Sequence, residues 1–209
     1  SKQPPASPVR ALYGAGLLRI WSDNLYARVM ALRETPASKQ AVITLGRAIV
    51  ANRKSPPEPE LLKALSPHMG SAWKLRRDRV CFFRSYLVLN SNYYLSHENI
   101  LNLDHATEAV IAPYELVSTA GDRKRCQFLL VKYGNHAHAK KALDHFRKAY
   151  LPEYKEELSA DSNNSGPSLF KLEDGWLGYQ LMGRYAAIVF ECPDRKSAGT
   201  IIENNQNGL

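Results

Sequence analysis

Three segments of this chain share a pattern that restricts its fold more than any other feature. In each segment, a run rich in β-forming residues ends at a turn or capping residue and continues directly into an amphipathic helix. The three runs are Tyr26–Pro36, Gln127–Asn135 and Ala186–Asp194. The pattern predicts a fold that combines a sheet with helices.

Each predicted helix start has a chemical cause. Thr35 and Asn135 are good N-caps, and Pro36 suits the first helical position, where no N–H group is required. Asp194 can both cap a helix and oppose its dipole. Apolar residues then recur at spacings of three and four, which in the second helix are Ala139, Ala142, Leu143, Phe146, Ala149 and Tyr150.

A hairpin is expected before each helix, within 17–33, 108–133 and 179–191. The sequence therefore predicts three ββα-like units, at about 17–53, 108–152 and 168–206. Such units indicate an α+β fold in which repeated ββα units build a largely antiparallel sheet with helices packed on one face. A short helix, Glu60–Leu65, and a strand, Val80–Leu89, are expected between the first two units.

A chain of 209 residues makes one ordinary domain or two small ones. We expect residues 1–10, which are rich in Pro and Ser, to be a flexible tether. Residues 11–209 are expected to form a single α+β domain. No apolar run approaches the roughly 18 residues that a membrane helix requires. The three cysteines lie in apolar runs without any CxxC spacing, which favours burial over zinc binding.

The strand and helix junctions resemble those of an uncharacterised bacterial family of predicted exported or lipid-anchored proteins. The resemblance lies in Asn99–Tyr114, Phe128–Tyr133, Ala139–Phe146 and Tyr150–Pro152, with Tyr26–Met30 and Glu34–Ala37 upstream. It covers most of residues 17–192 and includes no catalytic signature. It implies a periplasmic or extracellular location in the bacterial envelope and a domain cut from a longer precursor, with a possible membrane tether there. The missing N-terminal leader agrees with this expectation.

The net charge of +8 lies entirely in the first 125 residues, because residues 126–209 hold ten basic and ten acidic side chains. One candidate anion site is a basic run between residues 74 and 84 that could bind a nucleic-acid backbone, an anionic lipid surface or an acidic glycan. Its members are Lys74, Arg76, Arg77, Arg79 and Arg84. The sequence shows no RNP-like motif, helix-turn-helix spacing or zinc-finger pattern, which argues against nucleic acid as the natural ligand.

The densest polar cluster is a candidate ligand site, made of Tyr93, Tyr94, His97, Glu98, Asp104 and His105. Imidazole and carboxylate groups could bind a divalent metal or perform acid–base chemistry. However, His97 is not part of an HExxH motif, since residue 101 is leucine, and Asp104 is a favoured turn residue. A groove for sugar or peptide is a further possibility, lined by Trp73, Tyr86, Tyr93, Tyr94, Tyr114, Trp176 and Tyr179.

The preferred hypothesis is a non-enzymatic exported module. It would bind a partner protein or an extracellular ligand through the sheet face that helices leave uncovered. The first alternative is a metal-dependent enzyme or hydrolase centred on His97, Glu98, Asp104 and His105. The second is a polyanion or nucleic-acid binder that uses the basic run from Lys74 to Arg84. No motif indicates a cofactor, because neither a GxGxxG nor a Walker A spacing occurs.

Overall fold

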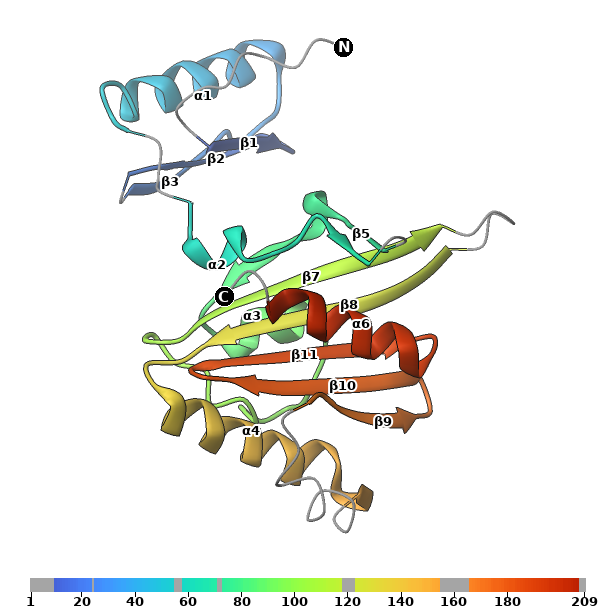
Figure 1. Cartoon of the computed structure of the whole chain (residues 1–209). Helices are drawn as coiled ribbons and strands as arrows, with labels where there is room; N and C mark the ends of the chain where they lie inside the picture. The colour runs from blue at the N-terminus through green and yellow to red at the C-terminus, as the bar shows by residue number, and fades with distance from the viewer. Residues whose placement is uncertain are drawn as a thin grey trace. The chain divides into compact units, whose positions relative to one another are not determined.

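The chain divides into two compact units, residues 1–58 and residues 59–209 (Figure 1). The computed structural model describes residues 10–23, 25–54, 58–70, 73–117, 123–154 and 166–206. The sequence predicts one domain over 11–209, whereas each unit has a hydrophobic core of its own. We describe each unit by itself and call them the small unit and the large unit.

The small unit is a three-stranded antiparallel sheet with one helix on it. Its elements are β1 (Arg10–Gly14), β2 (Leu17–Ser22), β3 (Leu25–Met30) and α1 (Pro36–Ile49). The core consists of Leu18 and Ile20 from the sheet together with Val42 and Val50. The predicted tether lies outside the described residues except for Arg10, which begins β1.

Helix α1 begins where the sequence predicts. The Thr35 side chain accepts a hydrogen bond from the Ser38 N–H at 3.1 Å, and Pro36 is the first helical residue. Gly46 lies over the sheet, and a Cβ atom there would come within 2.3 Å of Leu18 Cδ2 and 2.6 Å of Ile20 Cδ1. The absence of a side chain therefore lets α1 approach the sheet closely.

The large unit is built on an eight-stranded sheet in which every pairing is antiparallel. The strands run in the order β4-β5-β7-β8-β11-β10-β9, and β6 also pairs with β7. The strands are β4 (His68–Met69), β5 (Trp73–Leu75), β6 (Cys81–Phe83), β7 (Glu108–Val117), β8 (Arg123–Lys132), β9 (Ser168–Leu172), β10 (Gly175–Met182) and β11 (Tyr185–Cys192). The helices are α2 (Glu60–Lys63), α3 (Tyr86–Asn92), α4 (His136–Tyr150) and α6 (Arg195–Gln206), with 3-10 turns at Arg77–Arg79 and Pro152–Tyr154.

Both faces of the large sheet are covered. Leu129 belongs to a core that includes Phe146 of α4, whereas the adjacent Phe128 belongs to a second core that includes Ile201 of α6. Helix α6 lies in front of the strands in Figure 1. The α+β class and the antiparallel pairing are confirmed. The predicted packing of helices on one face holds for the small sheet. In the large sheet, β8 and β11 carry apolar residues on both sides, so both faces must be covered.

The prediction of a repeated unit is not confirmed. The order strand, strand, helix occurs in β2-β3-α1, in β7-β8-α4 and in β10-β11-α6. However, α4 and α6 pack on opposite faces of one sheet. A rotation that places the β7–β8 hairpin on the β10–β11 hairpin leaves their helices on opposite sides. The two strand–strand–helix units therefore have opposite handedness.

Other helix starts agree with the sequence. Asn135 Oδ1 accepts the His138 N–H at 2.9 Å, and Asp194 Oδ1 accepts the Ser197 N–H at 2.8 Å. The predicted strand Val80–Leu89 is wrong beyond β6, because the Ser85 side chain accepts the Leu87 N–H and starts α3. Among the described residues, no helix has the length and hydropathy needed to cross a membrane.

Candidate functional site

Two histidines of the predicted polar cluster lie on the surface of the large unit. His97 Nε2 lies 3.5 Å from Glu98 Oε1, with both side chains exposed, at 83% and 67%. The carbonyl oxygen of His105 accepts a hydrogen bond from Arg84 Nη1 at 2.8 Å. Throughout the described part of the chain, there is no group of three or more His, Cys, Asp or Glu side chains that could hold a metal ion. The structure therefore gives the metal-site interpretation no geometric support.

Asp104 has a local structural role. Its Oδ1 accepts the backbone N–H groups of Ala106 and Thr107, each at 2.9 Å. It also lines a cavity of about 350 Å³ at the start of α4, together with Tyr133, His138 and other residues. Because its Oδ1 already accepts two N–H groups, Asp104 is explained as a turn residue.

The two tyrosines of the cluster have different environments. Tyr93 packs against Phe190, with ring centroids 4.9 Å apart, and burial raises the pKa of its hydroxyl. Tyr94 is exposed at 69%. The other predicted groove aromatics are divided between the two cores: Tyr86 and Tyr179 belong to the α4 side, and Trp73, Tyr114 and Trp176 to the α6 side. These rings do not line one groove.

The basic run of the large unit is partly neutralised. Arg76 Nη1 contacts Glu115 Oε2 at 2.7 Å, and Arg76 Nε contacts Asp78 Oδ1 at 3.1 Å. Arg125 Nε binds the other oxygen of Glu115 at 2.9 Å. The Arg76 hydrogen bond is the main reason why the pKa of Glu115 lies below its ordinary value. These contacts form an ion-pair network on the sheet.

The remaining members of the run are spread over several elements. Arg84 Nη2 contacts Glu108 Oε1 at 2.9 Å. Lys74 lies on β5 opposite Glu115, and Arg77 and Arg79 belong to the 3-10 turn after that strand. Residues 59–209 carry 19 basic and 17 acidic side chains, so their net charge is only +2. The run is therefore part of a nearly balanced surface.

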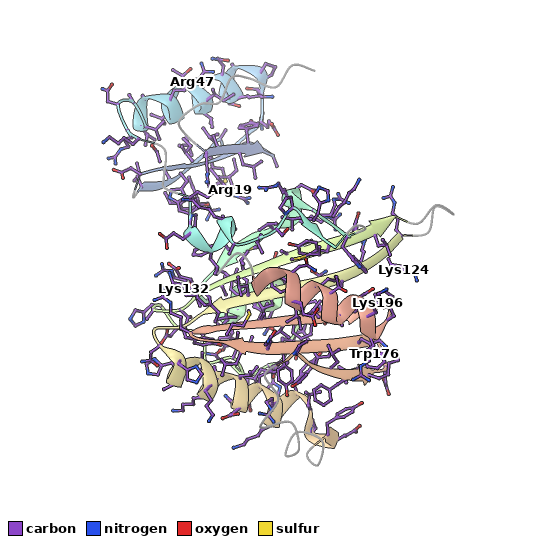
Figure 2. The ribbon with its side chains drawn as sticks, in the orientation of Figure 1. Arg19, Arg47, Lys124, Lys132, Trp176 and Lys196 are labelled. Atoms are coloured by element: carbon purple, nitrogen blue, oxygen red, sulfur yellow. The ribbon has the colours of Figure 1, made fainter. Side chains whose placement is uncertain are left out.

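The small unit holds most of the excess positive charge. Residues 1–58 contain nine Lys or Arg and three Asp or Glu, a net charge of +6. Strand side chains alternate between the two sides of a sheet. Leu18 and Ile20 point into the core beneath α1, so Arg19 and Trp21 point to the other side. Figure 2 shows Arg19 on one side of the small sheet and α1, with Arg47, on the other side.

We call this uncovered side the open face. Its charged residues are three arginines, Arg10, Arg19 and Arg28, and its aromatic residues are Trp21 and Tyr26. Arg10 Cζ lies 6.0 Å from the centre of the Trp21 ring, within the range of a cation–π contact. The open face, as the described residues define it, has neither a lysine nor a carboxylate.

Aliphatic side chains complete the open face. Leu12, Leu17 and Met30 lie on the same side as the arginines by strand register. Leu12 is exposed at 64%, Met30 at 67% and Tyr26 at 59%. These are large apolar side chains on one face, and such clusters mark interaction surfaces more often than scattered exposed residues do. The open face is therefore the best candidate functional site of the described residues.

Sequence reasoning predicted an uncovered sheet face but did not find these residues. One signal was present, the excess of basic residues before residue 59. The strand segment Leu17–Ser22 has apolar residues in both of its alternating sets of positions, so its periodicity does not distinguish the two faces. Neither shows which face a helix will cover. Comparisons of the chain with protein-family models, with curated proteins and with solved structures find no match, so the functional argument depends on the open face itself.

Proposed function

We propose that this protein is a non-enzymatic binding module whose open face binds an acidic surface of a partner protein. The observation that carries the proposal is the composition of that face. Arginine, tryptophan, tyrosine and methionine are the residues enriched in protein interfaces, and lysine, aspartate and glutamate are depleted there. The open face has the former and lacks the latter among its described residues.

The charge of the small unit indicates the chemistry of the partner. A net charge of +6 in residues 1–58 favours encounter with an acidic surface. All three charged residues of the open face are arginines, which are more weakly hydrated than lysines and suit buried ion pairs. Leu12 and Met30 add apolar contact area that a bare polyanion does not need. An acidic partner that also has apolar side chains fits this combination.

A peptide-display selection on the whole chain tests the proposal. Selected peptides should contain Asp or Glu together with apolar residues. Their binding should weaken about tenfold or more in Arg19→Glu, since a close charge pair becomes a like-charge contact. Arg47→Glu is the matched control, because Arg47 is an exposed arginine on α1. It should change affinity less than about twofold.

The same variants separate the partner classes. Heparin, a single-stranded oligonucleotide and vesicles containing anionic lipid are measured in parallel. If only these polyanions bind in an Arg19-dependent way, the protein-partner proposal fails. It fails equally if selected peptides bind both variants with one affinity, or if the selection returns no binder.

The proposal includes an exported location in the bacterial envelope, which is supported by the family resemblance of the strand and helix junctions. Fractionation of cells that express the protein from its natural gene tests it. The protein should be recovered with the periplasmic, outer-surface or membrane-tethered material. Recovery in the cytoplasmic fraction alone would contradict this part of the proposal.

A further inference from the structure

The open face is ordered into three rows that cross its strands. Trp21 lies opposite Tyr26 in the first row, and Arg19 lies opposite Arg28 in the second. Leu17 lies opposite Met30 in the third. Arg10 and Leu12 extend the first and second rows onto β1. The central row therefore carries two adjacent positive charges, with aromatic rings on one side and aliphatic side chains on the other.

The central row is unfavourable in the free protein. Like charges directly opposite each other on neighbouring strands destabilise a sheet. Within the described part of the small unit, neither Arg19 nor Arg28 has an ion-pair partner. A carboxylate placed between the two guanidinium groups would remove this repulsion, and the planar fork of arginine matches a carboxylate with two parallel hydrogen bonds.

The flanking rows add a requirement for apolar contacts on both sides of the anion. Trp21 and Tyr26 offer large ring surfaces on one side, and Leu17 and Met30 offer methyl and thioether surfaces on the other. Consecutive rows lie two residues apart along each strand, which corresponds to about 6.7 Å. A run of acidic residues would place a second charge on the Leu17–Met30 row, which has no charged residue, or on the first row, where Arg10 already lies against the Trp21 ring. A single carboxylate flanked by apolar groups does not.

From these rows, we infer that Arg19 and Arg28 together bind one acidic side chain of the partner, which is flanked on both sides by apolar side chains. This inference rests on the proposed function and names the part of the partner that the open face recognises. An extended partner segment would place the apolar side chains two residues before and after the acid. A helical segment would place them about four residues away.

Short displayed peptides with a fixed central glutamate and randomised flanks test the inference on the whole chain. Apolar residues should be enriched on both sides, at two or at four residues from the glutamate. Replacing the central glutamate of a selected peptide by glutamine should weaken binding about tenfold or more. If polyglutamate binds as tightly as the selected peptides, or if enrichment occurs on one side only, the inference is overturned.

A double-substitution cycle provides the second readout. Arg19→Gln and Arg28→Gln should each lose nearly as much affinity as the double variant, because both arginines hold the same carboxylate. Additive losses would show two independent contacts and overturn the inference. The thermal midpoint of free Arg28→Gln should not fall below that of the wild type, which excludes misfolding as the cause of weak binding. A different outcome would contradict the proposed function, namely equal peptide affinities of Arg19→Glu and Arg47→Glu.

Discussion

The two sheets of this protein differ in how many of their faces are covered. The large sheet has a hydrophobic core on each side, one with α4 and one with α6. The small sheet has a core only beneath α1, and its other side exposes arginines and large apolar residues. Covering both faces stabilises a sheet but leaves neither for recognition. The difference is the reason why the proposed binding function is placed on the small unit.

Removing a large side chain from the second core of the large unit should have the greatest effect. Phe128 is fully buried on the α6 side, and Phe128→Ala should lower the free energy of unfolding by about 3–5 kcal/mol. Tyr26→Ala, on the open face, should change it by no more than about 0.5 kcal/mol. Urea denaturation with hydrogen-exchange mapping measures both. A large loss in Tyr26→Ala would show that another surface buries the open face.

A side chain at Gly46 should separate α1 from the small sheet. Gly46→Val introduces atoms where Leu18 and Ile20 already lie, and it should cost about 1–3 kcal/mol. Ala48→Val is the control, because Ala48 is exposed on the same helix and receives the same β-branched side chain. Valine is a poorer helix former than alanine but not than glycine, so helix propensity lowers stability only in Ala48→Val. A Gly46→Val variant as stable as the wild type would therefore mean that packing at Gly46 is unimportant. Thermal unfolding of the whole chain distinguishes these outcomes.

The ion pairs at Glu115 should contribute less, and their effect should depend on pH. Arg76 lowers the folded-state pKa of Glu115 below its ordinary value of 4.5. The stabilisation is therefore present above pH 4.5 and is lost as the pH falls through the lowered pKa. Glu115→Gln should cost about 1 kcal/mol near neutral pH, and the difference from wild type should shrink in acid. A difference independent of pH would contradict an electrostatic cause.

The smallest effect concerns thiol reactivity and leaves stability unchanged. Cys81 is half-buried, whereas Cys126 and Cys192 are fully buried in the core on the α6 side. Burial raises the pKa of Cys81 and of Cys126, which lowers their thiolate fractions. Iodoacetamide should modify Cys81 first, and slowly. Prompt modification of Cys192 in the folded chain would show that the second core is open.

The sequence predicts much of the fold because many of its signals are local. Thr35, Asn135 and Asp194 act as caps within a few residues of themselves, so their helix starts are confirmed. The short strand β6 ends early for the same kind of reason, since Ser85 is also a cap. Candidate sites are harder to predict. Asp104 and Arg76 are explained by the hydrogen bonds and ion pairs that they form within the fold. The partner of Arg76, Glu115, lies far from it in the chain, so the sequence does not reveal the pair.

The sequence by itself determined where strands and helices begin and which side chains share a side of each strand, because caps and alternation act between near neighbours. Only the tertiary structure decided which of those sides a helix covers. That outcome depends on segments far apart in the chain, since Val42 shares one core with Ile20 and Ile201 shares another with Phe128. The open face exists because α1 packs on only one side of a sheet whose other side carries Arg19 and Arg28.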